Sequence, residues 1–151
     1  MASAALQRKI EQFFNRYQQR FQRALDDSGD VDAAGVVDAF ADYLIGSSPA
    51  GVRGGKNGIM YKFAIARGFA HYRKIGVVSM KIAAVETTSL DKLHVMAKVT
   101  WDSRSRRRSD GADIRIVFAN IYLLRLQREG PKIFAYITGD EEALLKKHRL
   151  V

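Results

Sequence analysis

ADIRIVFANIYLLRLQ, residues 112–127, alternates side-chain character with a period of two. Every second side chain of a strand points to the same face, so Phe118, Asn120 and Tyr122 share one face. The intervening positions are charged at both ends of the stretch and apolar in its middle, over residues 117–123. The pattern predicts a long strand whose central part is covered on both faces.

The composition is that of a single globular domain over residues 1–151. Hydrophobic residues make up 47% and charged residues 27%, and the length is sufficient to bury a core. No apolar run approaches the roughly 20 residues that cross a bilayer, and the N-terminus does not resemble a signal peptide. The chain has no cysteine, which excludes disulfides, thiolate metal sites and cysteine nucleophiles. We therefore expect a cytoplasmic protein without a membrane segment.

Two periodicities follow one another along the chain. Apolar residues first recur at three- and four-residue steps, which predicts helices at about 5–27, 32–45 and 57–73. The period then changes to two, which predicts strands at 77–88, 94–101, 112–127 and 133–138. Short connections favour antiparallel pairing, and EEALLKKH predicts a short C-terminal helix. The predicted fold class is α+β, with three N-terminal helices packed on an antiparallel sheet of about four strands.

This order of elements, together with several local motifs, resembles the nuclear transport factor 2-like superfamily, and in particular its bacterial polyketide-cyclase (SnoaL-like) branch. The motifs are DDSGDVDAAGVVDAFADYL at the end of the first helix, HYRKIG before a strand, VTW at a strand end, and the SDG and REG turns. The similarity covers nearly the whole chain, and its motifs are structural rather than catalytic. It implies a cone-shaped fold in which a strongly bent sheet wraps the helices and leaves a deep pocket at its open end.

The resemblance also implies a homodimer that forms through the outer face of the sheet. Such a dimer would explain the two apolar faces of the long strand, because one face would line the cone and the other would meet a second subunit. The alternative is that the ends of the chain cover residues 117–123. We expect the pocket to be largely apolar and to bind a small hydrophobic or amphipathic organic ligand. Its expected lining residues are Tyr17, Trp101, Phe118, Asn120 and Tyr122.

Asn120 is the most informative of these residues, because an amide is costly to bury on an apolar wall without partners. Its side chain either bonds to a neighbouring polar group or faces a wet cavity. Tyr17 matches a position where steroid isomerases of the superfamily can carry an oxyanion donor. The alternative for Tyr17 is a core tyrosine with a satisfied hydroxyl. The carboxylate base of those isomerases has no counterpart in IGSSPAG, so their mechanism is not implied.

The sequence leaves open whether the domain catalyses a reaction. An enzyme of the isomerase, cyclase or hydratase type would use Tyr17 and Asn120 as donors and Glu86 as acid or base. Glu86 would reach the cavity only if its strand runs without a bulge, and the alternative is a solvated glutamate at a strand end. The three histidines lack the spacing of metal ligands, and we expect neither a metal nor a cofactor.

Two further motifs receive structural interpretations. AGVRGGKN approaches a phosphate-binding loop, but Ala50 and Asn57 replace two of its required residues, and we expect a flexible pocket rim instead. The net charge of +9 and the RSRRR cluster at 104–108 would suit a polyanion. The cluster lacks the exposed aromatic residues that stack on bases, so we predict a solvated hairpin loop and no nucleic-acid partner. A basic module that binds nucleic acid or an acidic protein is the remaining alternative.

Overall fold

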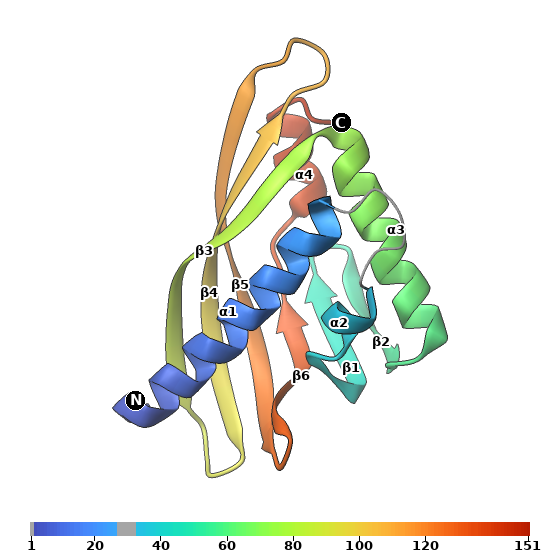
Figure 1. Ribbon diagram of the computed structural model, residues 1–151. Coiled ribbons are helices and arrows are strands. Elements are labelled where there is room, and N and C mark those ends of the chain that lie inside the picture. The colour runs from blue at the N-terminus through green and yellow to red at the C-terminus, as the bar shows by residue number, and fades with distance from the viewer. Residues whose placement is uncertain (1, 27–32) are drawn as a thin grey trace.

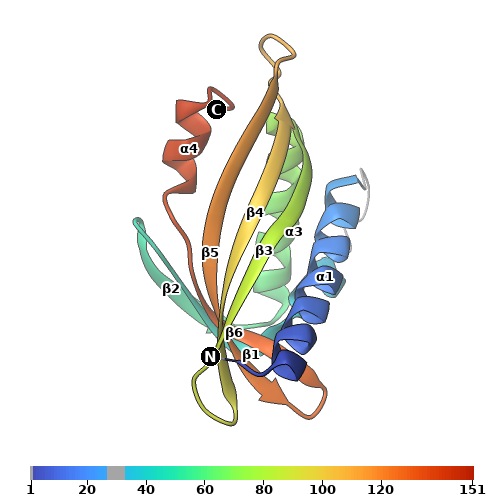
Figure 2. The same cartoon turned by 90° about the vertical axis from the view of Figure 1, so that its left-hand side faces the viewer.

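The computed structural model describes residues 2–26 and 33–151 (Figure 1). In chain order the helices and strands are α1 (Ala4–Asp26), α2 (Ala33–Val37), β1 (Phe40–Ser48), β2 (Gly51–Lys56), α3 (Ile59–Ile75), β3 (Val77–Ser89), β4 (His94–Arg106), β5 (Asp113–Gln127), β6 (Gly130–Ile137) and α4 (Glu141–Lys147). The strands of these described ranges form one sheet in the order β2-β1-β6-β5-β4-β3. The sheet is bent, and α1 and α3 lie on the same side of it (Figures 1 and 2).

β4 and β5 pair antiparallel over the whole length of β4 without a shift in register, from His94↔Arg125 to Arg106↔Asp113. Buried and accessible side chains alternate along β4, as the period of two predicts. Trp101 lies beside Phe118 in this ladder, and both face inward, towards the helices. The central pair of strands therefore decides which side chains of the sheet meet the helices.

α1 supplies the main apolar surface that covers the inner face of the sheet. Its buried residues recur at helical spacing: Ile10, Phe13, Phe14, Tyr17, Ala24 and Leu25. They pack with inward side chains of β4 and β5 into a continuous core, in which Val99, Trp101 and Leu124 are almost completely buried. Burial of each large apolar side chain contributes on the order of 1.5–3 kcal/mol, so this layer supplies much of the stability of the fold.

Two parts of the predicted fold are wrong. Residues 40–45, expected to be helical, form part of β1, and the Gly-rich stretch supplies β2. β1 pairs parallel with β6, as in Ile45↔Ala135, so the sheet of the described residues has six strands rather than about four. The apolar residues of this stretch suit either period, and pairing with a strand distant in sequence selects the extended form. The predicted helix boundaries at 27 and 32 lie outside the described residues.

The C-terminal segment folds back so that α4 contacts α3, where Glu141 accepts a hydrogen bond from the Tyr72 hydroxyl. The Asp140 carboxylate caps α4 by accepting a hydrogen bond from the Ala143 amide at 2.9 Å. The guanidinium of Arg107 donates to the carbonyl of His148 from Nε at 3.1 Å and from Nη2 at 2.9 Å. Arg107 also forms an ion pair with Asp110 at 3.0 Å. This buried arginine therefore fastens the C-terminal segment to the turn between β4 and β5.

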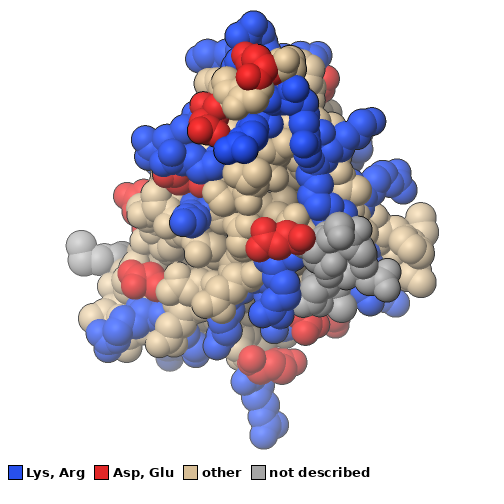
Figure 3. Space-filling model, turned by 45° about the horizontal axis from the view of Figure 1, so that its top comes forward, with Lys and Arg blue, Asp and Glu red and all other residues tan. Residues whose placement is uncertain are grey.

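The prediction of a solvated hairpin loop describes the RSRRR cluster only in part, since Arg104, Arg106 and Arg108 are exposed. Arg104 and Arg106 belong to β4, and Arg107 is buried. Arg108 donates to the carbonyls of Arg73 at 2.8 Å and Lys74 at 3.3 Å, in the last turn of α3. Arg104 and Arg106 lie within ion-pair distance of aspartates on β4 and β5. The arginines of the cluster thus form hydrogen bonds and ion pairs within the molecule. At this end of the molecule acidic side chains are interspersed with basic ones (Figure 3).

Gly76 is required by the geometry at the end of α3. Its φ of 97° is left-handed, and a Cβ at this position would lie 2.1 Å from the carbonyl oxygen of Arg106. We therefore expect Gly76→Ala to lower the free energy of unfolding by about 2 kcal/mol or more, from backbone strain and overpacking together. Gly68→Ala in the same helix meets open space and is expected to raise it by about 0.5–1 kcal/mol. Chemical denaturation measures both values, and equal midpoints for the two variants would contradict this assignment.

Candidate functional site

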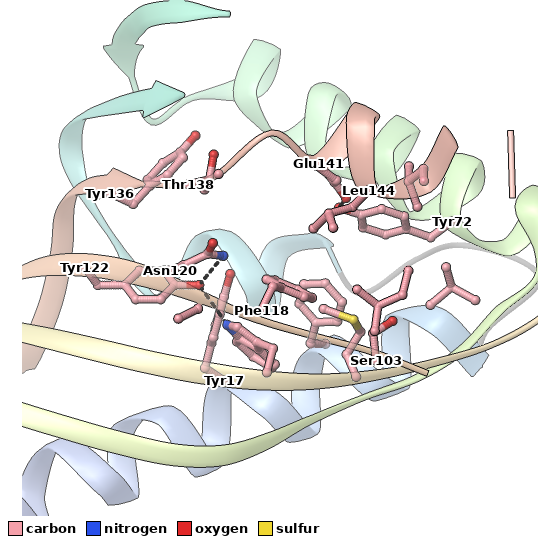
Figure 4. Close-up of a pocket in the computed structure, with 18 of the residues that line it drawn as sticks. Tyr17, Tyr72, Ser103, Phe118, Asn120, Tyr122, Tyr136, Thr138, Glu141 and Leu144 are labelled. Carbon is pink, nitrogen blue, oxygen red and sulfur yellow. Dashed lines mark hydrogen bonds between the residues drawn. The ribbon is translucent and has the colours of Figure 1, made fainter. Parts of the chain in front are cut away.

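A cavity of about 370 Å³ lies between the inner face of the sheet and helices α1, α3 and α4 (Figure 4). Its walls are mostly aromatic and aliphatic and come from β4, β5 and β6 as well as from the three helices. Small-molecule sites typically have volumes of about 300–1,000 Å³ and such apolar walls with a few polar groups. The cavity is therefore of a size and composition that suits a small organic molecule.

All five residues that the sequence places in a pocket line this cavity: Tyr17, Trp101, Phe118, Asn120 and Tyr122. The rings of Tyr17 and Trp101 pack edge to face with centroids 6.1 Å apart, and those of Tyr17 and Tyr122 lie 6.5 Å apart. Phe118 and Tyr122 flank Asn120 on the inner face of β5. The structure thus brings the predicted residues together, and their role as ligand contacts stays a prediction.

The hydroxyl of Tyr122 is the centre of the polar part of the cavity (Figure 4). It accepts hydrogen bonds from Trp101 Nε1 at 3.3 Å and from Asn120 Nδ2 at 3.4 Å. A phenolic oxygen has two acceptor positions and one proton to donate. Because both acceptor positions are used and no described residue receives the proton, the Tyr122 O–H is an oriented donor available to the cavity.

Two more polar atoms beside Tyr122 face the cavity without a hydrogen-bond partner among the described residues. They are the hydroxyl oxygen of Tyr17 and the side-chain oxygen of Asn120. Asn120 therefore combines both expected behaviours, because its nitrogen bonds a neighbour and its oxygen remains open. The alternative of a core tyrosine with a satisfied hydroxyl does not describe Tyr17. We call Tyr17, Asn120 and Tyr122 the amide–tyrosine group.

Burial keeps the phenols of the cavity protonated. It is the largest cause of the raised pKa of Tyr17, and the neighbouring Tyr122 adds to it. Burial also raises the pKa of Tyr122, although the hydrogen bonds from Asn120 and Trp101 act in the opposite direction. A phenol whose pKa lies above its usual value remains neutral at physiological pH. Both tyrosines can therefore donate hydrogen bonds to a ligand over a wide pH range.

Glu86 does not enter the cavity, and the alternative of a solvated glutamate describes it. β3 has register shifts between Val77 and Ser79 and between Ile82 and Ala84. An extra residue in a strand reverses which of the following side chains point inward. Glu86 is consequently exposed opposite Lys98 and does not line the cavity.

Glu141 is the carboxylate that the described residues do place on the cavity wall. It begins α4 and accepts a hydrogen bond from the hydroxyl of Tyr72 at 2.5 Å. From the sequence, an acidic residue at this position has only a helix-dipole role, and nothing in the local spacing reveals the contact with α3. Any acid–base chemistry in this cavity would therefore fall to Glu141 rather than to Glu86.

The Gly-rich hairpin contributes nothing to the cavity. The Gly-rich hairpin was expected to form a flexible rim, but no residue between 49 and 57 lines the cavity and 51–56 form β2. Among the described residues, no three His, Cys, Asp or Glu side chains are grouped to hold a metal ion. No helix of the described ranges is long and apolar enough to span a membrane.

Solved structures share this fold at low sequence identity. The ketosteroid isomerase-like protein from Erwinia carotovora atroseptica is 16% identical with a TM-score of 0.63, over 91% of this chain and 97% of that chain. Aln2 from a Streptomyces species is 14% identical with a TM-score of 0.68, over 97% and 98%. An NTF2-like protein with a cystatin-like fold from Novosphingobium aromaticivorans is 13% identical with a TM-score of 0.66, over 95% and 87%. These identities show the fold alone.

Sequence comparison gives the family. No curated protein shows significant similarity to the chain. The family profile described as "NTF2-like protein (DUF6841)" matches residues 7–141, and this does not single out the SnoaL-like branch, which stays a prediction. Since the match spans most of the sequence, the chain belongs to the NTF2-like family DUF6841 and has the α+β, cystatin-like fold of NTF2-like proteins.

Proposed function

We propose that this domain binds a small, predominantly apolar organic molecule and places a hydroxyl or carbonyl group of that molecule at the amide–tyrosine group. The observation that carries the proposal is unused hydrogen-bonding capacity at the cavity surface: the Tyr17 hydroxyl, Asn120 Oδ1 and the Tyr122 proton have no partner among the described residues. None of these three residues has a buried side-chain polar atom that lacks a partner, so their free positions are accessible from the cavity. Each hydrogen bond that a ligand completes there would contribute about 0.5–1.5 kcal/mol to binding.

The three polar atoms fit such a group because they differ in their hydrogen-bonding capacity. Asn120 Oδ1 only accepts, Tyr122 has a proton to donate, and the Tyr17 hydroxyl can do either. A ligand hydroxyl can donate to Asn120 while it accepts from a tyrosine, and a carbonyl oxygen can accept from both tyrosines. One structural relative is described as ketosteroid isomerase-like, and a ketone is an acceptor of this kind. Trp101 and Phe118 supply the apolar surface for the rest of the ligand.

Acid–base catalysis on the same ligand is a second candidate function, and Glu141 is the observation that favours it. Its carboxylate lines the cavity, and the bond from Tyr72 orients it. Burial and Glu141 together raise the pKa of Tyr72, so this phenol stays protonated beside the carboxylate. Glu141→Gln keeps the shape of the side chain and removes its basicity. A catalytic role requires that this variant lose turnover of a ligand that it still binds.

Binding can be measured directly, because Trp101 is the single tryptophan of the chain and lies on the cavity wall. We expect octanol to bind saturably and to change the Trp101 fluorescence. Asn120→Leu should weaken octanol binding by about tenfold through the lost hydrogen bonds. The same variant should leave the free energy of unfolding unchanged or raise it by up to about 1 kcal/mol, because leucine suits an apolar wall.

Asn15→Leu is the matched control for this experiment, since Asn15 is exposed on α1 and does not line the cavity. It should bind octanol like the unchanged protein. Octanol binding that is equally strong in Asn120→Leu would contradict the proposed role of Asn120. A large loss of stability in that variant would instead identify the amide as a structural group.

Octanol affinity should also depend on pH in a defined direction. The pKa values of Tyr17 and Tyr122 are raised, mainly by burial, so the neutral phenols persist in the folded state beyond their usual pKa of about 10. Their donors are present below that pH and are lost as the pH rises through the folded-state pKa values. We expect constant affinity between about pH 6 and 9, followed by loss of binding and structure at higher pH. A fall in affinity within the neutral range, measured by fluorescence titration, would argue against phenolic donors.

The proposal includes a homodimer that forms through the outer face of the sheet. Val117 on this face is 50% exposed, so the ends of the chain do not cover it. The strand register places Ile121 beside Ile137 and Leu123 beside Ala135, which makes one apolar band across β5 and β6. Contiguous exposed apolar surface of this kind favours association with another protein surface.

A single lysine on this band should separate the subunits. We expect the unchanged protein to sediment at twice the 16.9 kDa of one chain and Val117→Lys to sediment as a monomer, because the charge would be buried. Val52→Lys is the control, since Val52 is 64% exposed on the edge strand β2. Analytical ultracentrifugation at micromolar concentration measures all three. A monomeric unchanged protein would overturn the dimer.

A further inference from the structure

We propose that the cavity contains a second polar site, formed by Ser103 and Ser105, so that the ligand is an elongated neutral molecule with a hydrogen-bonding group at each end. We call these two residues the serine pair. The inference rests on the proposed function and deepens it, because it specifies the length and the chemistry of the ligand.

The serine pair combines deep burial with unused hydroxyl groups. Ser103 is 6% exposed and Ser105 is 3% exposed, and both line the cavity from the inner face of β4. Neither hydroxyl has a hydrogen-bond partner among the described residues. Ser48 and Ser89, by contrast, use their hydroxyl oxygens in turns near the protein surface. Among the described side chains the buried polar atom that lacks a partner is Thr87 Oγ1, so the two serine oxygens are accessible from the cavity. They therefore give an otherwise apolar part of the wall hydrogen-bonding groups that a ligand can reach.

The strand register places the serine pair away from the amide–tyrosine group. Asn120 is opposite Val99, and Ser103 lies four residues further along β4. At the rise of a strand this separation is about 13 Å, and Ser105 lies about 7 Å beyond. Figure 4 shows Asn120 and Tyr122 at one end of the cavity and Ser103 towards the other. The paired rings of Trp101 and Phe118 lie between the two polar sites.

The charges around the cavity restrict the ligand further. None of the described lining residues is a lysine, an arginine or a histidine, so nothing there neutralises a carboxylate or a phosphate. The one charged lining residue of the described chain, Glu141, would repel an anion. A serine hydroxyl can donate a hydrogen bond to a ketone, and it can donate to or accept from a neutral hydroxyl. The ligand class is therefore a diol, a hydroxyketone or a diketone whose polar ends are about 13 Å apart.

Straight-chain alcohols of graded length test this arrangement, with each primary alcohol compared with the diol of the same carbon number. We expect the second hydroxyl to strengthen binding roughly two- to tenfold once the two oxygens can be about 13 Å apart, and to give no gain in shorter diols. Trp101 fluorescence measures both affinities in the 151-residue chain. In the double variant Ser103→Ala, Ser105→Ala the gain should disappear while the affinity for the monoalcohols is unchanged.

Ser109→Ala is the matched control, because Ser109 is exposed in the turn between β4 and β5 and should retain the full gain. Should the double variant fail to fold, we expect the gain from the second hydroxyl to disappear in Ser103→Ala alone. Diols that bind no better than monoalcohols at any length, or a gain that survives removal of the serines, would overturn the second polar site. Binding of neither probe would instead refute the proposed function, on which the inference depends.

Discussion

The uninterrupted ladder between β4 and β5 is the constraint on which the rest of the structure depends. From His94↔Arg125 to Arg106↔Asp113 every residue has a partner, so a shift of one position would turn all inward side chains outward. The ladder sets Trp101 beside Phe118, and Tyr122 Oη then accepts hydrogen bonds from Trp101 and Asn120. One ladder therefore determines the core, the cavity wall and the direction in which the Tyr122 proton is available.

The sequence was sufficient to predict an element wherever its local periodicity agrees with its tertiary environment. α3 begins and ends within about two residues of its predicted bounds, and α1 begins one residue before its predicted start, because their apolar faces repeat at helical spacing. The shared face of Phe118, Asn120 and Tyr122 was also predicted from alternation alone, since β5 has no register shift against β4. Trp101 could be placed beside these residues because its own strand alternates without interruption.

Prediction failed where a distant partner or an extra residue decides the structure. β1 depends on parallel pairing with β6, and no local pattern encodes that partner. The irregularity between Ile82 and Ala84 turns Glu86 outward, and no glycine or proline in that part of β3 marks it. The reasoning that placed Trp101 could also have placed Ser103 and Ser105, because they lie at every second position after Trp101 and so share its inward face of β4. They were missed because their small polar side chains interrupt the apolar alternation that identifies a strand.

Because side chains alternate between the two faces of β5, this strand carries both the proposed ligand site and the proposed dimer surface. Asn120 faces the cavity, while its neighbour Ile121 lies at a position that the outer face would use. A second subunit packed against that face would restrict the backbone of the strand that carries Asn120 and Tyr122. Restricting the polar wall before a ligand arrives reduces the entropy lost on binding. Dimerisation would therefore strengthen ligand binding although no residue of the second subunit enters the cavity, and ligand binding would strengthen dimerisation by the same factor.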